Sequence, residues 1–405
     1  MSTGLLYHAW GIRGYRYVRT TYPKGGGICF GIEQAPGTFR CANCGSCDVV
    51  KSGQVVRHFH SLPVGSHAVS IELPVQRLWC SGCGKTRQAQ VAFAHERRSY
   101  THAFERYALE LCRHMTMLDV ANHLGVGWDA IKDIQGRHLH RHFAKPRLKD
   151  LRHIAVDEIS VGKGQRFVTV VLDLDSGAVV FVGEGKGADS LDPFWRRLNG
   201  AHAHIHAVAT DMSHAYTLAV RKHLPKAIHV FDRFHVVKLF NEKLSVLRRE
   251  LHRAAQDTLQ KEVLKGTRWL LLKNPQNLDP EKNEQQRLKQ ALALNKPLAT
   301  AYYLKEDLRQ FWEQESRADA ERFLDHWLAR ARAARLEILF QLAQTLARHR
   351  EGLLAWYDCP ISTGPLEGTN TKIKLMQRQA YGFRDREFFK LKIYALHKTR
   401  VELIG

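Results

Sequence analysis

The sequence has no run of about 18 apolar residues, the length that a membrane-spanning helix needs. Its first residues also lack the basic start and apolar block of a secretory signal. Acidic residues are scarce: 40 Asp and Glu stand against 61 Lys and Arg, which leaves a net charge of +21 at pH 7. Small domains usually carry a net charge of about 2–8, so this excess indicates a polyanionic partner such as nucleic acid. We therefore expect a cytoplasmic, nucleoid-associated protein, with a basic membrane-surface protein as the alternative.

Eight cysteines in a reducing compartment indicate metal ligands rather than disulfides. Four of them form two Cys-x-x-Cys pairs, each followed by a glycine, and four thiolates satisfy tetrahedral zinc. The segment between the pairs has a strand-like composition, so residues 1–98 are predicted to contain N-terminal strands and a zinc ribbon. Cys47 adds an ambiguity, because Cys44 and Cys47 are also spaced as a pair. Redox-active or unliganded thiols are the other alternative. The predicted structural zinc ligands are Cys41, Cys44, Cys80 and Cys83.

Residues 99–145 are predicted to form a helix-turn-helix DNA-binding domain. Apolar residues recur at helical spacing on both sides of a glycine-containing turn. The second of these helices would enter a major groove of DNA, and an ordinary helical hairpin is the alternative. The residues expected to face inward on the first helix are Leu118, Val120, Ala121 and Leu124. The DNA contacts expected on the second are Trp128, Lys132 and Arg137.

Residues 146–234 show strand and helix patterns in the order βββαβαβ, which predicts an α/β layered core. The first strand, HIAVDEI, ends in Asp157 and Glu158, whose side chains must point to opposite faces of the sheet. Asp211 closes the fourth strand and Asp232 the fifth. Neighbouring strand ends in an open sheet can converge on one site. The alternative for a lone acid is a strand that has simply reached water.

Residues 235–357 are strongly helical and charged, and we expect an all-helical insertion into the core. Three of its tryptophans are expected to pack in its interior rather than to stack on nucleic-acid bases: Trp269, Trp312 and Trp327. No internal repeat or low-complexity tract is evident in the chain.

The core is expected to resume at residues 358–405, where a Gly-Pro pair leads into a basic helix. Glu367 and Asn370 of this helix are three residues apart and share a face. An ordinary exposed basic helix is the alternative to a DNA-binding one. The DNA contacts expected here are Asn370, Lys372, Lys374 and Arg378.

Three acids suit a divalent-metal site, because Mg²⁺ (or Mn²⁺) prefers carboxylate oxygens. Two such ions about 3.5–4 Å apart can promote phosphodiester chemistry. Glu158, Asp173 and Glu184 also compete for the third position. Glu158 should face away from Asp157. Asp173 falls near the far end of the second strand, and Glu184 lies two strands away from Asp157. The preferred set is Asp157, Asp211 and Glu367.

Four segments resemble a known family: VDEIS, ATDMSHAY, VFDRFHVVK and STGPLEGTNTKIKLMQRQAYGFRD. They are similar to the motifs of bacterial DDE transposases, with the ISL3 family of insertion-sequence transposases as the closest match. The resemblance covers nearly the whole chain. It implies a ribonuclease-H-like catalytic core with Asp157, Asp211 and Glu367 as the metal-binding triad. Asp232 and His235 match an Asp-x-x-His motif of such transposases, and they are expected to support the site.

The resemblance also implies an activity, namely binding to the terminal inverted repeats of an insertion sequence, followed by metal-dependent DNA cleavage and strand transfer. The partners would be the element ends and target DNA, with the protein acting as a homodimer or higher oligomer. Two other functions stay open. One is a non-catalytic DNA-binding regulator derived from a transposase, and the other is a ribonuclease-H-like nuclease that cuts without joining.

Overall fold

The computed structural model describes residues 4–162, 166–256 and 258–397. Contacts divide this part of the chain into two compact units, one up to Ala144 and one from Lys145 onward. Among the residues described, no helix combines the length and the apolar character that crossing a bilayer requires.

The first unit contains a five-stranded sheet in the order β1-β2-β4-β3, with β5 also paired to β4. β3 and β4 form an antiparallel pair. Apolar and polar residues alternate along β4, which buries Val69, Ile71, Leu73 and Val75 on one face. The strands are β1 (Tyr15–Thr21), β2 (Ile28–Gln34), β3 (Val49–Val64), β4 (His67–Cys80) and β5 (Lys85–Gln88).

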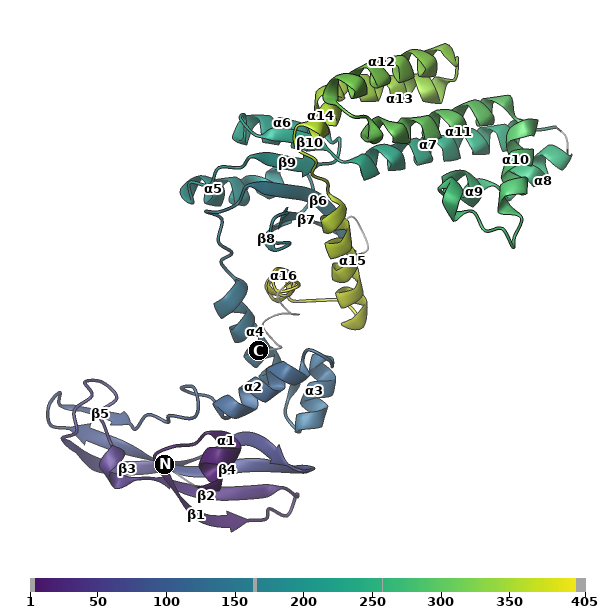
Figure 1. Ribbon diagram of the computed structural model, residues 1–405. Helices are drawn as coiled ribbons and strands as arrows, with labels where there is room; N and C mark the ends of the chain where they lie inside the picture. Colours follow the sequence, from purple (N-terminus) through teal and green to yellow (C-terminus); the bar gives the residue numbers. More distant parts are fainter. Residues whose placement is uncertain (1–3, 163–165, 257, 398–405) are drawn as a thin grey trace. The chain divides into compact units, whose positions relative to one another are not determined.

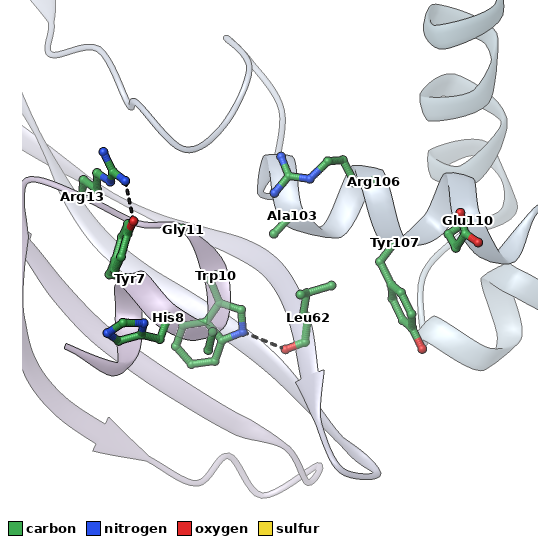
Figure 2. A pocket seen from close by; sticks show the side chains of 11 residues that line it. Tyr7, His8, Trp10, Gly11, Arg13, Leu62, Ala103, Arg106, Tyr107 and Glu110 are labelled. Carbon is green, nitrogen blue, oxygen red and sulfur yellow. Dashed lines mark hydrogen bonds between the residues drawn. The ribbon is translucent and has the colours of Figure 1, made fainter. Parts of the chain in front are cut away.

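A short helix, α1 (Leu5–Trp10), packs against this sheet. The side chain of Trp10 is buried, and its indole Nε1 donates a hydrogen bond to the carbonyl of Leu62 at 3.3 Å (Figure 2). A shallow groove beside α1 is lined by Arg13, Arg106 and Glu110, among others. None of the residues predicted for metal or DNA binding lines this groove in the described part of the chain.

Three helices complete the first unit: α2 (His102–Leu111), α3 (Met117–Leu124) and α4 (Trp128–Phe143). Thr116 caps α3, because its hydroxyl accepts a hydrogen bond from the backbone N–H of Asp119 at 3.2 Å. Gly125 ends α3 in the left-handed conformation with φ of 63°. The turn between α3 and α4 thus contains the glycine that the sequence pattern places there.

The inward face of α3 agrees with the prediction at three of four positions. Val120, Ala121 and Leu124 are buried. Leu118 is 57% exposed, so its predicted inward orientation is wrong. It lies two residues before Val120, and at 3.6 residues per turn this places it on the other side of the helix.

The second unit contains a five-stranded mixed sheet in the order β10-β9-β6-β7-β8. The central strand β6 is antiparallel to β7 and parallel to β9, while β10 is parallel to β9 and β8 is antiparallel to β7. The βββαβαβ order predicted from the sequence is present. The elements are β6 (His153–Gly162), β7 (Arg166–Asp173), β8 (Val179–Glu184), α5 (Asp192–Gly200), β9 (Ala207–Thr210), α6 (His214–His223) and β10 (Ile228–Phe231).

The two faces of β6 pack against different helices. Ile154 and Val156 point into a core that includes Phe194 of α5 and Tyr216 of α6. On the other side, α15 (Gly364–Gln379) contacts β6 and α16 (Arg386–Tyr394) contacts β8 (Figure 1). Even-numbered residues of β6 therefore face α5 and α6, and odd-numbered residues face the side on which α15 lies.

Between β10 and α15 the chain forms an all-helical lobe, green in Figure 1. Trp312 and Trp327 are buried in its core, as predicted. Trp269 is 65% exposed, so its predicted interior position is wrong, and the helix that carries it buries Leu270 and Leu271 instead. The helices of the lobe are α7 (Arg233–Ala254), α8 (Thr258–Lys265), α9 (Arg268–Leu272), α10 (Glu284–Leu294), α11 (Lys296–Arg309), α12 (Arg317–Ala333), α13 (Glu337–Arg348) and α14 (Arg350–Leu354).

Candidate active site

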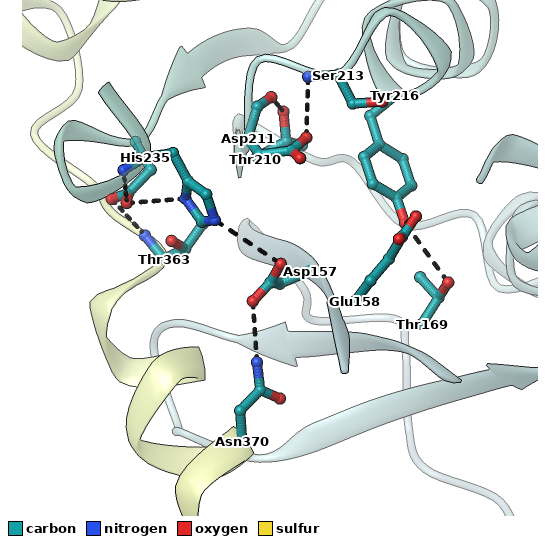
Figure 3. Close-up of polar contacts among 11 residues, drawn as sticks. Asp157, Glu158, Thr169, Thr210, Asp211, Ser213, Tyr216, His235, Thr363 and Asn370 are labelled. Carbon is teal, nitrogen blue, oxygen red and sulfur yellow. Dashed lines mark hydrogen bonds and ion pairs between the residues drawn. The ribbon is translucent and has the colours of Figure 1, made fainter. Parts of the chain in front are cut away.

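Three carboxylates follow the parallel strands of the core sheet. Asp211 directly follows β9 and Asp232 directly follows β10, while Asp157 lies two residues beyond Ala155, the last residue of β6 that pairs with β9. Because β6, β9 and β10 are parallel, these residues lie toward one edge of the sheet. Figure 3 shows Asp157 and Asp211 there. Asp157 is not at the end of its strand as predicted, since β7 stays paired with β6 and the strand continues to Gly162.

The Asp157 carboxylate is largely buried and has a neighbour at each oxygen. Asn370 of α15 donates a hydrogen bond from Nδ2 to Oδ2 at 2.9 Å, and His235 Nε2 lies 4.0 Å from Oδ1. Burial raises the pKa of Asp157, and the charges of Asp211 and Glu158 add to the rise, against the opposing charge of His235. The site therefore favours a positive partner for this carboxylate.

The Asp211 carboxylate turns back onto the start of α6. Its Oδ1 accepts a hydrogen bond from the backbone N–H of Ser213 at 2.9 Å. Burial raises the pKa of Asp211, and the charge of Glu158 contributes to the rise, while the Ser213 hydrogen bond and the charge of His235 oppose it. Two desolvated carboxyls with raised pKa values on neighbouring strands form an arrangement that a divalent cation would stabilise.

Asp232 and His235 form a buried pair at the start of α7. The Asp232 side chain is 2% exposed, and its Oδ2 faces His235 Nδ1 at 3.2 Å. Its Oδ1 accepts a hydrogen bond from the backbone N–H of Thr363 at 3.0 Å. Burial alone would raise the pKa of Asp232 and lower that of His235, but their mutual interaction lowers the first and raises the second. The His235 ring thus faces Asp232 through Nδ1 and Asp157 through Nε2, and its raised pKa favours the protonated form.

Glu158 points to the opposite face of β6, as alternation along the strand predicts. Its Oε1 accepts hydrogen bonds from the Tyr216 hydroxyl at 2.7 Å and from the backbone N–H of Gly187 at 2.8 Å. Burial and the Glu158 carboxylate raise the pKa of Tyr216. Glu158 is therefore held by protein donors on the α6 side of the sheet.

On α15 the residue that reaches Asp157 is Asn370. Glu367, one turn earlier, is exposed, and its carboxylate has no hydrogen-bond or ion-pair partner within the residues that the structure describes. Asn370 is 9% exposed, and its Oδ1 is buried without a hydrogen-bond partner in that same part of the chain. Lys372, Lys374 and Arg378 are exposed on the same helix.

The four cysteines predicted as zinc ligands come together in the first unit. Their sulfur atoms lie within 4.8 Å of one another, with Sγ–Sγ distances of 3.7 Å for Cys41 and Cys83 and 3.6 Å for Cys44 and Cys80. Backbone N–H groups of Cys44 and Asn43 lower the pKa of Cys41, which favours the thiolate form that binds metal. This cluster is compatible with a zinc site, and Cys47 is exposed outside it.

Two of the DNA contacts predicted on α4 lie together on the surface, and the third is engaged within the unit. Trp128 is 41% exposed, and Lys132 Nζ lies 5.4 Å from the centre of its ring. Arg137 forms ion pairs with Glu105 at 2.7 Å and Asp133 at 3.1 Å. These contacts favour a role for Arg137 in holding α2 against α4, and its predicted contact with DNA stays a prediction.

Sequence reasoning missed the internal partners of the acids. Tyr216 and Thr363 were not singled out, and Asn370 was expected to touch DNA rather than Asp157. One signal was present for Glu158: a buried acid needs hydrogen-bond donors, and Tyr216 lies in the helix that follows Asp211.

Comparisons with known proteins agree with the sequence motifs. A family profile described as a transposase matches residues 154–393, and the profile of the helix-turn-helix domain of transposase family ISL3 matches residues 89–138. The Bordetella parapertussis transposase for insertion sequence element IS1001 is 32% identical over 95% of this chain and 96% of that protein. The Mycobacterium tuberculosis transposase for IS1557 is 31% identical over 85% of this chain and 82% of that protein.

Among solved structures, the Drosophila P element transposase strand transfer complex aligns with 76% of this chain and 94% of that chain. Its TM-score is 0.38 at 12% identity, which is too low to support an argument. The transposase profile covers more than half of the chain, and the IS1001 relative matches it almost from end to end. The chain therefore belongs to the ISL3 family of transposases.

Proposed function

We propose that this transposase binds the terminal inverted repeats of an insertion sequence and catalyses metal-dependent DNA cleavage and strand transfer. The observation that carries the proposal is the placement of two desolvated carboxylates, Asp157 and Asp211, after adjacent parallel strands. The net charge of +21 supports a polyanionic substrate. Family membership supports the same reaction class.

The catalytic core in this proposal is ribonuclease-H-like. Its support is the strand order β10-β9-β6-β7-β8, in which an antiparallel β6-β7-β8 meander is extended by two parallel strands. The helical lobe then divides the core into residues 146–234 and 358–405. Residues 1–98 would form the N-terminal strands and zinc ribbon, and residues 99–145 the helix-turn-helix DNA-binding domain.

Asp157 and Asp211 would hold Mg²⁺ or Mn²⁺, because carboxylate oxygens suit a hard cation. Burial raises the pKa of both carboxyls, and a bound cation would stabilise their charged forms. Two bound ions would activate the attacking oxygen and stabilise the leaving oxygen. Glu367 is the proposed third carboxylate. It lies one turn before Asn370 on α15, and its exposed side chain is unengaged within the described chain.

Asp232 and His235 would support this site without ligating the metal. The Asp232 oxygens already accept hydrogen bonds from His235 and Thr363, and imidazole is a poor match to a magnesium centre. Cys41, Cys44, Cys80 and Cys83 would hold a structural zinc. Trp128 and Lys132 of α4 would contact the terminal repeats, and Lys372, Lys374 and Arg378 of α15 would contact phosphates.

An excision assay on a plasmid carrying the element ends tests this function. Wild-type protein with Mg²⁺ should release the element and join it to new DNA. We expect it to act as a homodimer or higher oligomer on DNA. Asp157→Asn, Asp211→Asn and Glu367→Gln should each abolish cleavage while binding to the ends persists. Cutting without joining would instead identify a nuclease, and end binding without cutting would identify a regulator.

A comparison of two variants tests which acid is the third carboxylate of the metal site. Glu158→Gln removes a carboxylate that faces Tyr216 on the other side of β6. If Glu367→Gln still excises DNA while Glu158→Gln does not, the assignment of Glu367 is wrong.

A further inference from the structure

A groove on the helical lobe runs along α7, the helix whose first turn carries His235. Lys238, Arg248 and Arg249 of α7 line it together with Arg268 of α9. Lys238 and Arg249 lie on the same side of α7, since 11 residues make about three full turns, and Arg248 lies beside them on the groove wall. Glu242 is the acid among the lining residues.

The cations of this groove are not neutralised by the protein. In the part of the chain that the structure describes, none of Lys238, Arg248, Arg249 and Arg268 has an ion-pair partner. Arg248 Nη1 and Arg249 Nε donate only to backbone carbonyls, at 2.8 and 3.4 Å. Elsewhere on the lobe, exposed cations such as Arg322 and Arg330 are paired with acids.

Like charges in the groove repel one another. Burial lowers the pKa of Arg248, and the charges of Arg268 and Arg249 lower it further. Keeping several cations together without ion-pair partners is unfavourable unless an anionic partner binds them. Phosphates spaced along a DNA backbone supply that partner, and Arg and Lys are the side chains that contact them most.

The α7 residues that line the groove begin next to His235, which faces the carboxylate site. Lys238 lies one helical turn after His235, and its positive charge is among those that oppose the burial-driven rise in the pKa of Asp211. DNA that passes Asp157 and Asp211 would therefore meet Lys238 first and Arg249 and Arg268 farther along α7.

We propose that this groove binds the phosphate backbone of the element-end DNA next to the bond that is cut. The inference rests on the proposed function and adds a role for the helical lobe. It predicts a contact on the lobe that is separate from end recognition by the first 144 residues.

The test compares two full-length variants. Lys238→Ala/Arg249→Ala/Arg268→Ala removes three exposed groove cations. Lys282→Ala/Arg322→Ala/Arg330→Ala removes three cations of the same lobe that are paired with acids outside the groove. Both variants lose three positive charges. A difference in DNA binding between them therefore comes from where the lost charges lie and not from the change in net charge. Thermal unfolding of each checks that the fold is intact.

Binding is measured against salt for two duplexes, one that spans the cleavage site and one that stops inside the terminal repeat. Each phosphate contact contributes about 0.9 to the slope of log K against log salt. For the spanning duplex, the groove variant should lower the slope by about 2–3, and the control variant should leave it near the wild-type value. For the shorter duplex, all three proteins should agree.

Equal slopes for wild type and groove variant on the spanning duplex would overturn the inference, as would an equal loss on both duplexes. Failure of the proposed function gives a different pattern. In that case the wild type would not prefer element ends or would not cut them, whatever the groove variant does to the slope.

Discussion

Asn370 connects α15 to Asp157. It donates to Asp157 Oδ2 at 2.9 Å from a position that is 9% exposed. We expect this hydrogen bond to orient the carboxylate for metal binding, so Asn370→Ala should weaken Mn²⁺ affinity about 10–100-fold, as removal of an outer-shell partner typically does. Titration calorimetry on the full-length protein without DNA measures this affinity.

Asn370→Asp keeps the shape of the side chain and replaces the donor with an acceptor. It should bind Mn²⁺ no better than Asn370→Ala, whereas wild-type or tighter binding would mean that a side-chain oxygen at position 370 can reach the metal. Thr371→Ala, at an exposed position of the same helix, is the matched control. Loss of binding in Asp157→Asn separately verifies the metal site.

The Asp232–His235 pair should make stability depend on pH. The pKa of His235 is raised above its ordinary 6.5, so its contribution is complete below pH 6.5 and is lost as pH rises through the raised value. The pKa of Asp232 is lowered below 3.8, so its contribution is complete above pH 3.8 and is lost as pH falls through the lowered value. Both contributions to stability are therefore complete between pH 3.8 and pH 6.5.

His235→Gln should therefore lower the free energy of unfolding most within that window, by about 1–3 kcal/mol for a hydrogen bond to a charged group. The difference from wild type should shrink above neutral pH. Denaturant unfolding in EDTA at several pH values measures it. A difference that stays constant from pH 5 to pH 9 would show that the imidazole charge has no part in the pair.

Local alternation made the direction of Glu158 predictable, because neighbouring residues of a strand face opposite sides. The contact between Asn370 and Asp157 was not predictable in this way. The two residues are 213 positions apart, with the whole helical lobe between them. Spacing on α15 indicates which of its residues share a face, but only the packing of α15 on β6 decides which of them reaches the carboxylate.

At the scale of elements, α14 packs closely on the core sheet through Gly352. A Cβ atom at this position would overlap the ring of Phe231 in β10. Gly352→Ala should therefore destabilise the protein by about 1–3 kcal/mol through overpacking. Gly368 of α15 has open space around its Cα, so Gly368→Ala should instead stabilise by up to about 1 kcal/mol through helix propensity.

Chemical denaturation of both variants in EDTA measures the two changes. Opposite signs would support close docking of α14 on β10, since both substitutions add the same methyl group to a helix. Stabilisation by Gly352→Ala would show that α14 is not held against Phe231.

Elements of the core were predictable either from a long pattern or from a short apolar run with a clear end. Strands β6 and β7 have 10 and 8 residues, whereas β9 and β10 have only four residues each and are mostly apolar runs that an acid follows directly. Trp269 lies in α9, which has only five residues, too few for a periodic pattern to decide which side is buried. Leu118 lies in the first turn of α3 on the side opposite Val120, so its apolar side chain faces outward.

At the scale of the whole molecule, the division at Ala144 separates the cysteine cluster and the helix-turn-helix from the carboxylates. Each unit has its own buried core. We expect residues 1–144 to fold alone, to contain about one zinc per chain, and to bind the terminal repeats in preference to random DNA. Zinc retained after Cys80→Ser/Cys83→Ser would rule out the four-cysteine site.

Two substitutions on α4 in this fragment should separate DNA contact from folding. Lys132→Ala should lower the salt slope of binding by about 0.9, because one phosphate contact is lost. Arg137→Ala should instead destabilise the fragment, because Glu105 and Asp133 lose their partner. Fluorescence anisotropy against salt, with thermal unfolding alongside, measures both effects. If Arg137→Ala lowers the slope without loss of stability, Arg137 contacts DNA directly, and its ion pairs in the unbound protein only hold it ready for a phosphate.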